Sequence, residues 1–183
     1  MLGRIAAVAA IAAGGVLLSK RMKGRSRSGS GTGSFVETGI DVEVPVSTAY
    51  NQWTQFEEFP QFMHSVHEVR QLDDTHLHWR ATVAGQDKEW EAEITEQIPD
   101  QRIAWRSTSG AANAGVVTFE KLSESSTKVT LRMSYDPETP REKLGDALGA
   151  MKLEAKGNLK RFKELIESRG VESGAWRGTV PEH

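Results

Sequence analysis

The side chains best suited to metal binding in this sequence do not form a complete set. His64 and His67 are three residues apart, and His76 and His78 share one face of a predicted strand. A zinc site takes three or four ligands, and neither pair has a partner set at ligand spacing. The chain contains no cysteine, which excludes disulfides and thiolate ligands. We therefore predict no metal site and no cofactor, and we assign these histidines to structure or surface.

Acid–base and phosphate-binding patterns are also incomplete. Glu91 and Glu93 alternate with apolar residues, so this carboxylate pair belongs to the wet face of a strand. The stretch 107–115 contains glycine but lacks the Lys-Ser/Thr of a phosphate loop, and it reads as a strand connection beside a cavity mouth. No G-x-S-x-G, HExxH or EF-hand pattern occurs. We predict no catalytic residue.

Bulky apolar side chains, in contrast, converge on one predicted surface. They alternate with polar residues along several predicted strands and face the apolar stripe of a long predicted helix. Two interpretations stay open: these side chains line a cavity for an apolar ligand, or they fill a solid core. The candidate ligand-binding residues are Trp79, Trp90, Trp105, Phe119, Met133, Tyr135, Leu144, Leu148 and Met151.

Period-two alternation predicts the strands that carry these residues. Between them lie short connections with turn-forming residues, which favour an antiparallel meander with one wet face. After the first strand, Ser47 resembles a helix cap, and Pro60 separates two short helical pieces. The alternating segments are 36–44, 76–83, 89–94, 102–106, 117–119 and 129–135.

Residues 139–170 predict one long amphipathic helix. Thr139, Pro140 and Glu142 form a capping pattern, and Gly170 can supply the left-handed stop. At about 1.5 Å per residue the helix is roughly 45 Å long, and only the sheet offers it a large enough partner surface. Gly145, Gly149 and Gly157 either leave room for a ligand or a close sheet contact, or are tolerated at the surface. The apolar stripe consists of Leu144, Leu148, Met151, Ala155, Leu159, Phe162 and Ile166.

The order of elements resembles the helix-grip fold, an α+β fold in which a curved antiparallel sheet of about six to seven strands wraps around a long C-terminal helix. The stretches 44–50, 56–63, 90–94 and 103–107 resemble the polyketide cyclase/dehydrase group of the START-like (SRPBCC) superfamily, to which the coenzyme Q-binding proteins also belong. The resemblance covers about 36–170 and continues through 174–178. It implies a cavity between helix and sheet for sterols, quinones, polyketides or other apolar molecules, and it transfers no catalytic residue.

The first 34 residues differ in composition from the rest of the chain. Residues 5–18 are uncharged and apolar, but as a helix they span only about 21 Å of a hydrocarbon core of about 30 Å. We predict a membrane anchor at 1–19, reinforced by lipid contacts of the basic residues up to 27, with the domain on the cytoplasmic side. A cleaved signal peptide and a transit peptide are the alternatives. Residues 20–34 form a basic linker rich in Ser and Gly.

Residues 35–170 are then a single START-like domain, and 171–183 form a C-terminal tail. Residues 1–34 hold six basic side chains, and the rest of the chain holds 17 basic and 25 acidic ones, a net charge of −8. Such a charge repels phosphate backbones, so nucleic acid is excluded as a partner. The favoured function is binding of a lipid, isoprenoid quinone or polyketide-like molecule at the membrane.

Two other functions are alternatives. The first is a cyclase or dehydratase, for which the available polar groups are Tyr135, Thr118, and Arg80 if its strand face is reversed. The second is an interaction protein with a solid core.

Overall fold

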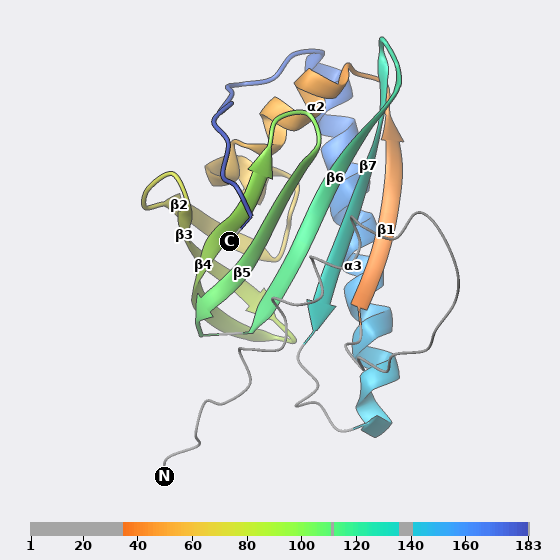
Figure 1. Ribbon diagram of the computed structural model, residues 1–183. Coiled ribbons are helices and arrows are strands. Elements are labelled where there is room, and N and C mark those ends of the chain that lie inside the picture. The colour runs from red at the N-terminus through yellow and green to blue at the C-terminus, as the bar shows by residue number, and fades with distance from the viewer. Residues whose placement is uncertain (1–34, 111, 136–140, 183) are drawn as a thin grey trace, which may run out of the picture. The chain divides into compact units, whose positions relative to one another are not determined.

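The computed structural model describes residues 35–110, 112–135 and 141–182, with the backbone alone at Tyr135 and 141–144. This part of the chain forms one sheet, two short helical segments and one long helix (Figure 1). The elements in chain order are β1 (Phe35–Val42), α2 (Val46–Trp53), the 3-10 helix η2 (Phe56–Gln61), β2 (Val66–Gln71), β3 (His76–Val83), β4 (Gln86–Ile98), β5 (Arg102–Ser109), β6 (Asn113–Ser123), β7 (Ser126–Tyr135) and α3 (Arg141–Arg169).

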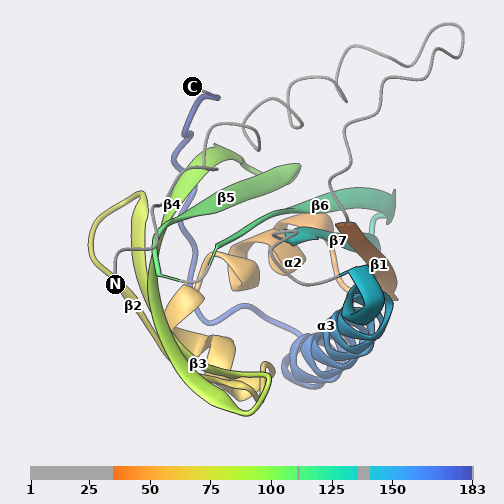
Figure 2. The same ribbon diagram turned by 90° about the horizontal axis from the view of Figure 1, so that it is seen from below.

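The sheet has seven strands in the order β1-β7-β6-β5-β4-β3-β2, and all neighbours are antiparallel. Seen along the strands, the sheet curls around α2 and η2, and α3 lies beside β1 across the opening of the curl (Figure 2). This arrangement confirms the predicted α+β helix-grip fold. The sequence pattern did not predict β2 as a separate strand. Only Val66 and Val69 of its six residues are buried.

Strand alternation gives the sheet an inner and an outer face. On the inner face Ile103 pairs with Val117, and Val117 with Leu131, and all three side chains are buried. On the outer face Arg106 bonds to Glu93 of the neighbouring strand at 3.1 Å. The predicted wet face is therefore confirmed, and Glu93 forms a surface ion pair there.

Aromatic side chains from α2 and η2 fill one end of the curl. Trp53 of α2 lies at the centre and meets Phe162 of α3 edge-on, with ring centroids 4.9 Å apart. Such edge-to-face contacts add about 0.5–1.5 kcal/mol per pair to the burial of the rings. The buried aromatic set consists of Tyr50, Trp53, Phe56, Phe59, Phe62, Phe119 and Phe162.

The predicted stripe of α3 packs on the sheet as expected. Its buried residues include Ala155, Leu159, Phe162 and Ile166. The helix ends where predicted, because Gly170 has a φ of +71° and its N–H bonds to the carbonyl of Ile166 at 2.9 Å. Thr139, Pro140 and the side chain of Leu144 lie outside the described residues.

The three helix glycines leave no gap at the sheet. Gly145 and Gly149 are exposed, and a Cβ at either position would meet nothing within 4 Å. Gly157 lies against the guanidinium of Arg161 from the same helix. Of the two interpretations left open, tolerance at the surface therefore holds for Gly145 and Gly149, whereas Gly157 is partly buried and contacts its own helix.

Two predicted details of the short helices are wrong. The first helix begins at Val46 after Pro45, without a side-chain cap, so Ser47 lies inside it. The break between the helices falls after Trp53, where the Thr54 hydroxyl donates to the carbonyl of Asn51 at 2.6 Å. Pro60 lies inside η2, which is possible because Pro60 fixes a helical φ and only its N–H is lost.

The two ends of the curl are distinct. At the open end β1 starts, β5 and β7 end and α3 starts; at the closed end lie α2, the β6–β7 turn and the last turn of α3 (Figure 1). Among the described residues no helix combines the length and the apolar character that a membrane crossing requires.

Candidate functional site

The inner face divides into a closed half and an open half that differ in exposure. Toward the closed end, Ile103 of β5 and Val129 of β7 are at most 1% exposed. Further toward the open end on β4, β5 and β7, the inner residues Trp90, Trp105 and Met133 are only partly buried against the core. Among the described residues, the large aromatic side chains of the inner face are thus more accessible in its open half.

Trp79 and Trp90 form a stacked pair in this open half. They are directly opposite each other on β3 and β4, their ring planes are 7° apart, and their centroids are separated by 5.8 Å. Trp79 also contacts Phe59 of the aromatic set, with centroids 5.7 Å apart. The Trp79 indole Nε1 is buried and has no hydrogen-bond partner in the described part of the chain. Leaving a buried donor unpaired costs about 1–3 kcal/mol, so an acceptor from outside the chain would stabilise this site if the surrounding side chains moved apart to admit it.

Trp105 lies across the neighbouring strand at Gly115. The two residues are cross-strand partners, and a Cβ at position 115 would collide with Cζ2 of the indole and lie 2.8 Å from its Cη2. Glycine in a strand interior often marks such a close approach. Gly115 therefore allows the Trp105 ring to lie close against β6.

The remaining candidate residues lie in the open half, in the closed half, or outside the described residues. Met133 pairs with Gly115 and, with Leu148 and Met151 of α3, is partly buried at the open half. Phe119 belongs to the closed half, where its ring contacts Tyr50 at a centroid distance of 5.5 Å. The side chains of Tyr135 and Leu144 lie outside the described residues.

Two of the polar groups considered for catalysis point away from the inner face. Thr118 alternates with buried Val117 and Phe119, so its side chain is on the outer face. Arg80 is exposed and alternates with Trp79 and Ala81. The strand face of Arg80 is not reversed and Thr118 lies on the outer face, so neither can take part in inner-face chemistry.

Two of the histidines, His67 and His76, make surface contacts. His76 Nδ1 lies 2.9 Å from the Asp73 carboxylate, and His67 Nε2 lies 2.7 Å from the Thr82 hydroxyl. The backbone N–H of Thr75, the His76 ring and the backbone N–H of His76 lower the Asp73 pKa to about 2. Within the described ranges, no three histidine or carboxylate groups come together as a metal site.

The tail after α3 fastens the closed end of the domain. Arg177 donates to both oxygens of Asp100, at 3.0 and 2.7 Å, and to Asn51 Oδ1 of α2 at 2.7 Å. Val180 exchanges two backbone hydrogen bonds with Gln97 of β4, at 2.8 and 3.0 Å. Gln97 lies beyond the part of β4 that pairs with β3. The tail thus joins α2 to the β4–β5 turn and covers a free strand edge.

Sequence reasoning missed Gly115 and the anchoring role of the tail. The Gly115 signal was present, because a glycine between alternating apolar residues of a strand points to a close neighbour. The Arg177–Asp100 pair spans 77 positions and has no sequence signature.

Comparison with known proteins supports the same architecture. The profile of the family "Polyketide cyclase / dehydrase and lipid transport" matches residues 42–164. An uncharacterized 17.2 kDa protein of Streptomyces lincolnensis is 56% identical over 148 residues, 80% of this chain and 99% of that protein.

Two solved structures are similar in fold. A START superfamily protein from Mycobacterium smegmatis has a TM-score of 0.63 at 15% identity and covers 72% of this chain and 98% of its own. The Zhui aromatase/cyclase from Streptomyces sp. R1128 has a TM-score of 0.63 at 14% identity and covers 79% of this chain and 99% of its own.

The curled sheet and the long helix across its opening define the helix-grip fold. Because the family profile covers most of the domain, the chain belongs to the polyketide cyclase/dehydrase and lipid transport family.

Proposed function

We propose that this protein binds an apolar small molecule on the open half of its inner face, beneath α3 and beside a membrane. The contrast between the two halves carries the proposal. The closed half is filled by the aromatic set, whereas Trp79, Trp90 and Trp105 remain partly exposed on the face that turns toward α3. Exposed aromatic surface in a concave position is typical of sites for apolar ligands.

The unpaired Trp79 Nε1 favours a ligand that also carries a hydrogen-bond acceptor. A carbonyl oxygen would satisfy this donor, and the surrounding rings would bury the apolar part of the molecule. Isoprenoid quinones and polyketide-like molecules combine a carbonyl with a large apolar body. Within the proposal, these two classes rank above simple hydrocarbons and fatty acyl chains without a nearby acceptor.

The membrane part of the proposal rests on residues 1–27, which lie outside the described residues. Their apolar run and the basic residues that follow it are two attachment signals of the kind that together hold a protein to anionic lipid. Apolar ligands concentrate in bilayers, so an attached binding domain would sit beside its supply. The cytoplasmic side is proposed because basic flanks are retained there.

Identification of bound molecules tests the proposal. Purified protein is extracted with organic solvent, the extract is analysed by mass spectrometry, and the molecules found are added back in a thermal-unfolding assay. At a free concentration of 100 times its Kd, a ligand that binds only the folded state stabilises the protein by about 2.7 kcal/mol. Trp105→Leu should weaken this response strongly, whereas Trp176→Leu in the tail, a matched loss of an indole, should leave it unchanged. An empty extract, together with no stabilisation by quinones or polyketide-like molecules, would contradict the proposal.

A further inference from the structure

We propose that residues 172–180 of the tail are a peptide ligand of the domain, and that the same segment of a second copy of the chain can take their place, so that two chains exchange tails. The inference goes beyond the proposed function and does not depend on it. We call the surface that holds the tail, on α2, η2, the end of β4 and the β4–β5 turn, the tail-binding surface. It consists of Tyr50, Asn51, Gln52, Thr54, Glu58, Gln97 and Asp100.

The tail lies on this surface as an extended peptide. From the end of α3 it runs past α2 to β4 (Figure 1). Glu172, Gly174 and Trp176 are partly buried, whereas the residues between them are exposed. Alternation with period two is typical of an extended chain that has one face on a partner. At the far end Val180 pairs with Gln97 in an antiparallel bridge, which is the backbone recognition used when a peptide adds a strand to a sheet edge.

Side chains at and after the end of α2 bind the backbone of the tail. Gln52 Oε1 accepts from the Ser173 N–H at 2.9 Å, and the Thr54 hydroxyl accepts from the Trp176 N–H at 3.0 Å. Together with the bridge at Val180, these bonds hold the tail through its backbone at three points.

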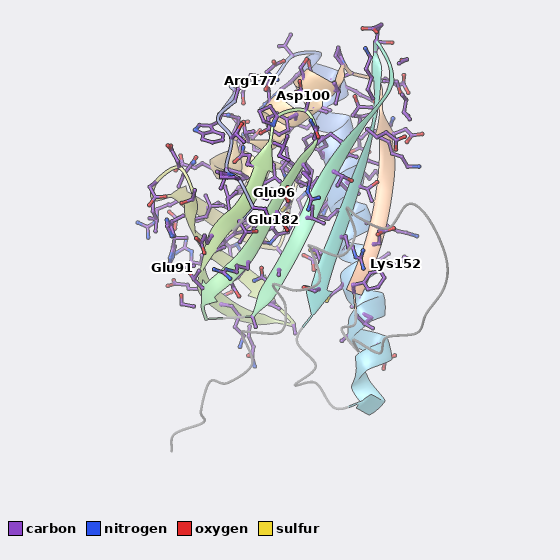
Figure 3. The ribbon with its side chains drawn as sticks, viewed as in Figure 1. Glu91, Glu96, Asp100, Lys152, Arg177 and Glu182 are labelled. Carbon is purple, nitrogen blue, oxygen red and sulfur yellow. The ribbon has the colours of Figure 1, made fainter. Side chains whose placement is uncertain are left out.

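Arg177 adds side-chain recognition. Its guanidinium donates to both Asp100 oxygens and to Asn51 Oδ1, and it lies 5.7 Å from the centroid of the Tyr50 ring. Figure 3 shows Arg177 and Asp100 together at the closed end. Because a guanidinium presents its donors in a fixed fork, lysine cannot replace all of these contacts. Backbone and side-chain contacts are thus combined as in a peptide-recognition site.

The tail-binding surface is polar, which suits an exchangeable partner. Asn51, Gln52 and Thr54 are at most 7% exposed with the tail in place, and water can hydrate all three when the tail leaves. Among the described tail residues, Val180 is the only apolar one that is buried. Permanent interfaces, in contrast, resemble a protein core. We therefore expect the tail to detach without unfolding of the domain.

Gly170 gives the tail a hinge next to this surface. Its φ is +71°, and glycine occupies positive and negative φ with similar ease. Val171 follows with 64% exposure, and contacts begin at Glu172, whose carboxylate accepts from Asn51 at 2.8 Å. A rotation at Gly170 thus releases the tail while α3 stays in place. On a second copy the released tail meets the same groups, so exchange preserves each contact and costs chiefly the association of two chains.

A synthetic peptide tests recognition between separate molecules. The peptide comprises residues 171–182 with a fluorophore at its N-terminus, and the receptor is the full-length protein with its own tail weakened by Arg177→Ala and Val180→Asp. We expect saturable binding by fluorescence anisotropy. Methylation of the Val180 amide nitrogen removes the donor to Gln97 and should weaken binding by roughly fivefold, since one hydrogen bond contributes a factor of about 2 to 10. Methylation at Thr179, whose N–H makes no hydrogen bond in the described part of the chain, is the matched control and should change little.

Cross-linking between chains tests the second copy as the occupant. The chain has no cysteine, so Gln97→Cys is placed in one chain and Val180→Cys in another. Strand partners that exchange both backbone bonds have Cα atoms about 5.5 Å apart, which is within disulfide range. After mixing and oxidation we expect a disulfide between the two variants, with a yield that rises with protein concentration and falls when the unlabelled peptide is added. Val83→Cys, exposed at the β3–β4 turn of the open end, replaces Gln97→Cys as the control and should give no such link.

Two results would overturn the inference. No binding of the peptide, or equal binding of the two methylated peptides, would contradict a peptide-recognition site. Peptide binding without a disulfide between Gln97→Cys and Val180→Cys would exclude the second copy as the occupant and favour a foreign peptide of the same pattern. Because the cross-linked chains keep Arg177, this second measurement decides the question even if the weakened receptor does not fold.

Discussion

The indole of Trp105 lies against Gly115 so closely that this position has no room for a side chain. A Cβ there would also lie 2.8 Å from the carbonyl oxygen of Arg132, which belongs to the backbone and cannot move aside independently. The contact fixes Trp105 at the boundary between the packed and the open half of the inner face. Its geometry therefore links the stability of the sheet to the shape of the candidate site.

Gly115→Ala should destabilise the fold and disturb the site together. The added methyl group must displace both the Trp105 ring and a strand, and overpacking of this kind costs about 1–3 kcal/mol. Gly149→Ala is the matched control, because that helix position is exposed with nothing within 4 Å and alanine there gains about 1 kcal/mol. Chemical denaturation measures both changes, and equal midpoints for Gly115→Ala and the unaltered protein would contradict the close contact.

Trp79→Phe should reduce affinity selectively for ligands that carry an acceptor. The substitution keeps an aromatic ring but removes the unpaired Nε1 donor. A hydrogen bond to a neutral acceptor contributes about 0.5–1.5 kcal/mol, so we expect a quinone to lose up to about tenfold more affinity than a hydrocarbon of similar size. Isothermal titration of the two ligands with Trp79→Phe and with Trp90→Phe separates the loss of the donor from the loss of ring volume. Equal losses for both ligands in Trp79→Phe would show that the donor does not contact the ligand.

Arg177→Lys should loosen the tail with little change in global stability. Lysine keeps the charge but cannot make the two-point contact to Asp100 while also reaching Asn51. Both groups of the ion pair are partly exposed, so its contribution to global stability is at most about 1 kcal/mol. Hydrogen exchange followed by mass spectrometry should show faster exchange at the Val180 amide, which bonds to Gln97. Lys121→Ala removes a surface ion pair elsewhere and should leave this exchange unchanged.

The Glu58 carboxylate should make the attachment of the tail depend on pH. Burial alone would raise its pKa, but hydrogen bonds from Ser173, Gln52 and Arg169 outweigh burial and leave the pKa below the ordinary value of 4.5. A lowered pKa in the folded state stabilises the protein above that ordinary value, and the contribution disappears as the pH falls through the folded pKa. Glu58→Gln should therefore be less stable than the unaltered protein at neutral pH, and the difference should shrink below about pH 4.5. A difference that stays constant down to pH 2 would exclude this role.

Much of the fold could be predicted because its elements have strong local periodicity. The stripe from Ala155 to Ile166 and the alternation around Trp105 each specify which side is buried, and a long one-sided helix can pack only against the sheet. The exact limits of α2 and η2 were less predictable. Their start depends on Pro45 and their separation on a Thr54 hydrogen bond, both weaker local signals than periodicity.

The sequence predicts which side of the sheet carries the candidate site, but not which residues on that side stay accessible. Alternation assigns Phe119, Trp105 and Met133 to one side of the sheet without saying how far the aromatic set reaches along it. Phe119 is covered because Tyr50 and Trp53 approach from α2, a contact between segments about 70 residues apart. Long-range packing of this kind decides which inner residues stay accessible, and a single sequence does not encode it in any local pattern.

Removal of the first residues should free the protein from membranes without unfolding the domain. The described fold begins at Phe35, where β1 pairs with Ser134 of β7, and fourteen apolar residues with a basic flank precede it. Each basic residue near an anionic surface contributes about 1 kcal/mol to attachment, so deletion of this segment should move the protein from the membrane pellet to the supernatant. A chain that starts at Ser34 should keep the thermal midpoint of the full-length protein, because ordered termini depend on the contacts they make and those of β1 remain. Full-length protein found in the supernatant at physiological salt, or recovered without its first residues, would show that this segment is not a membrane anchor.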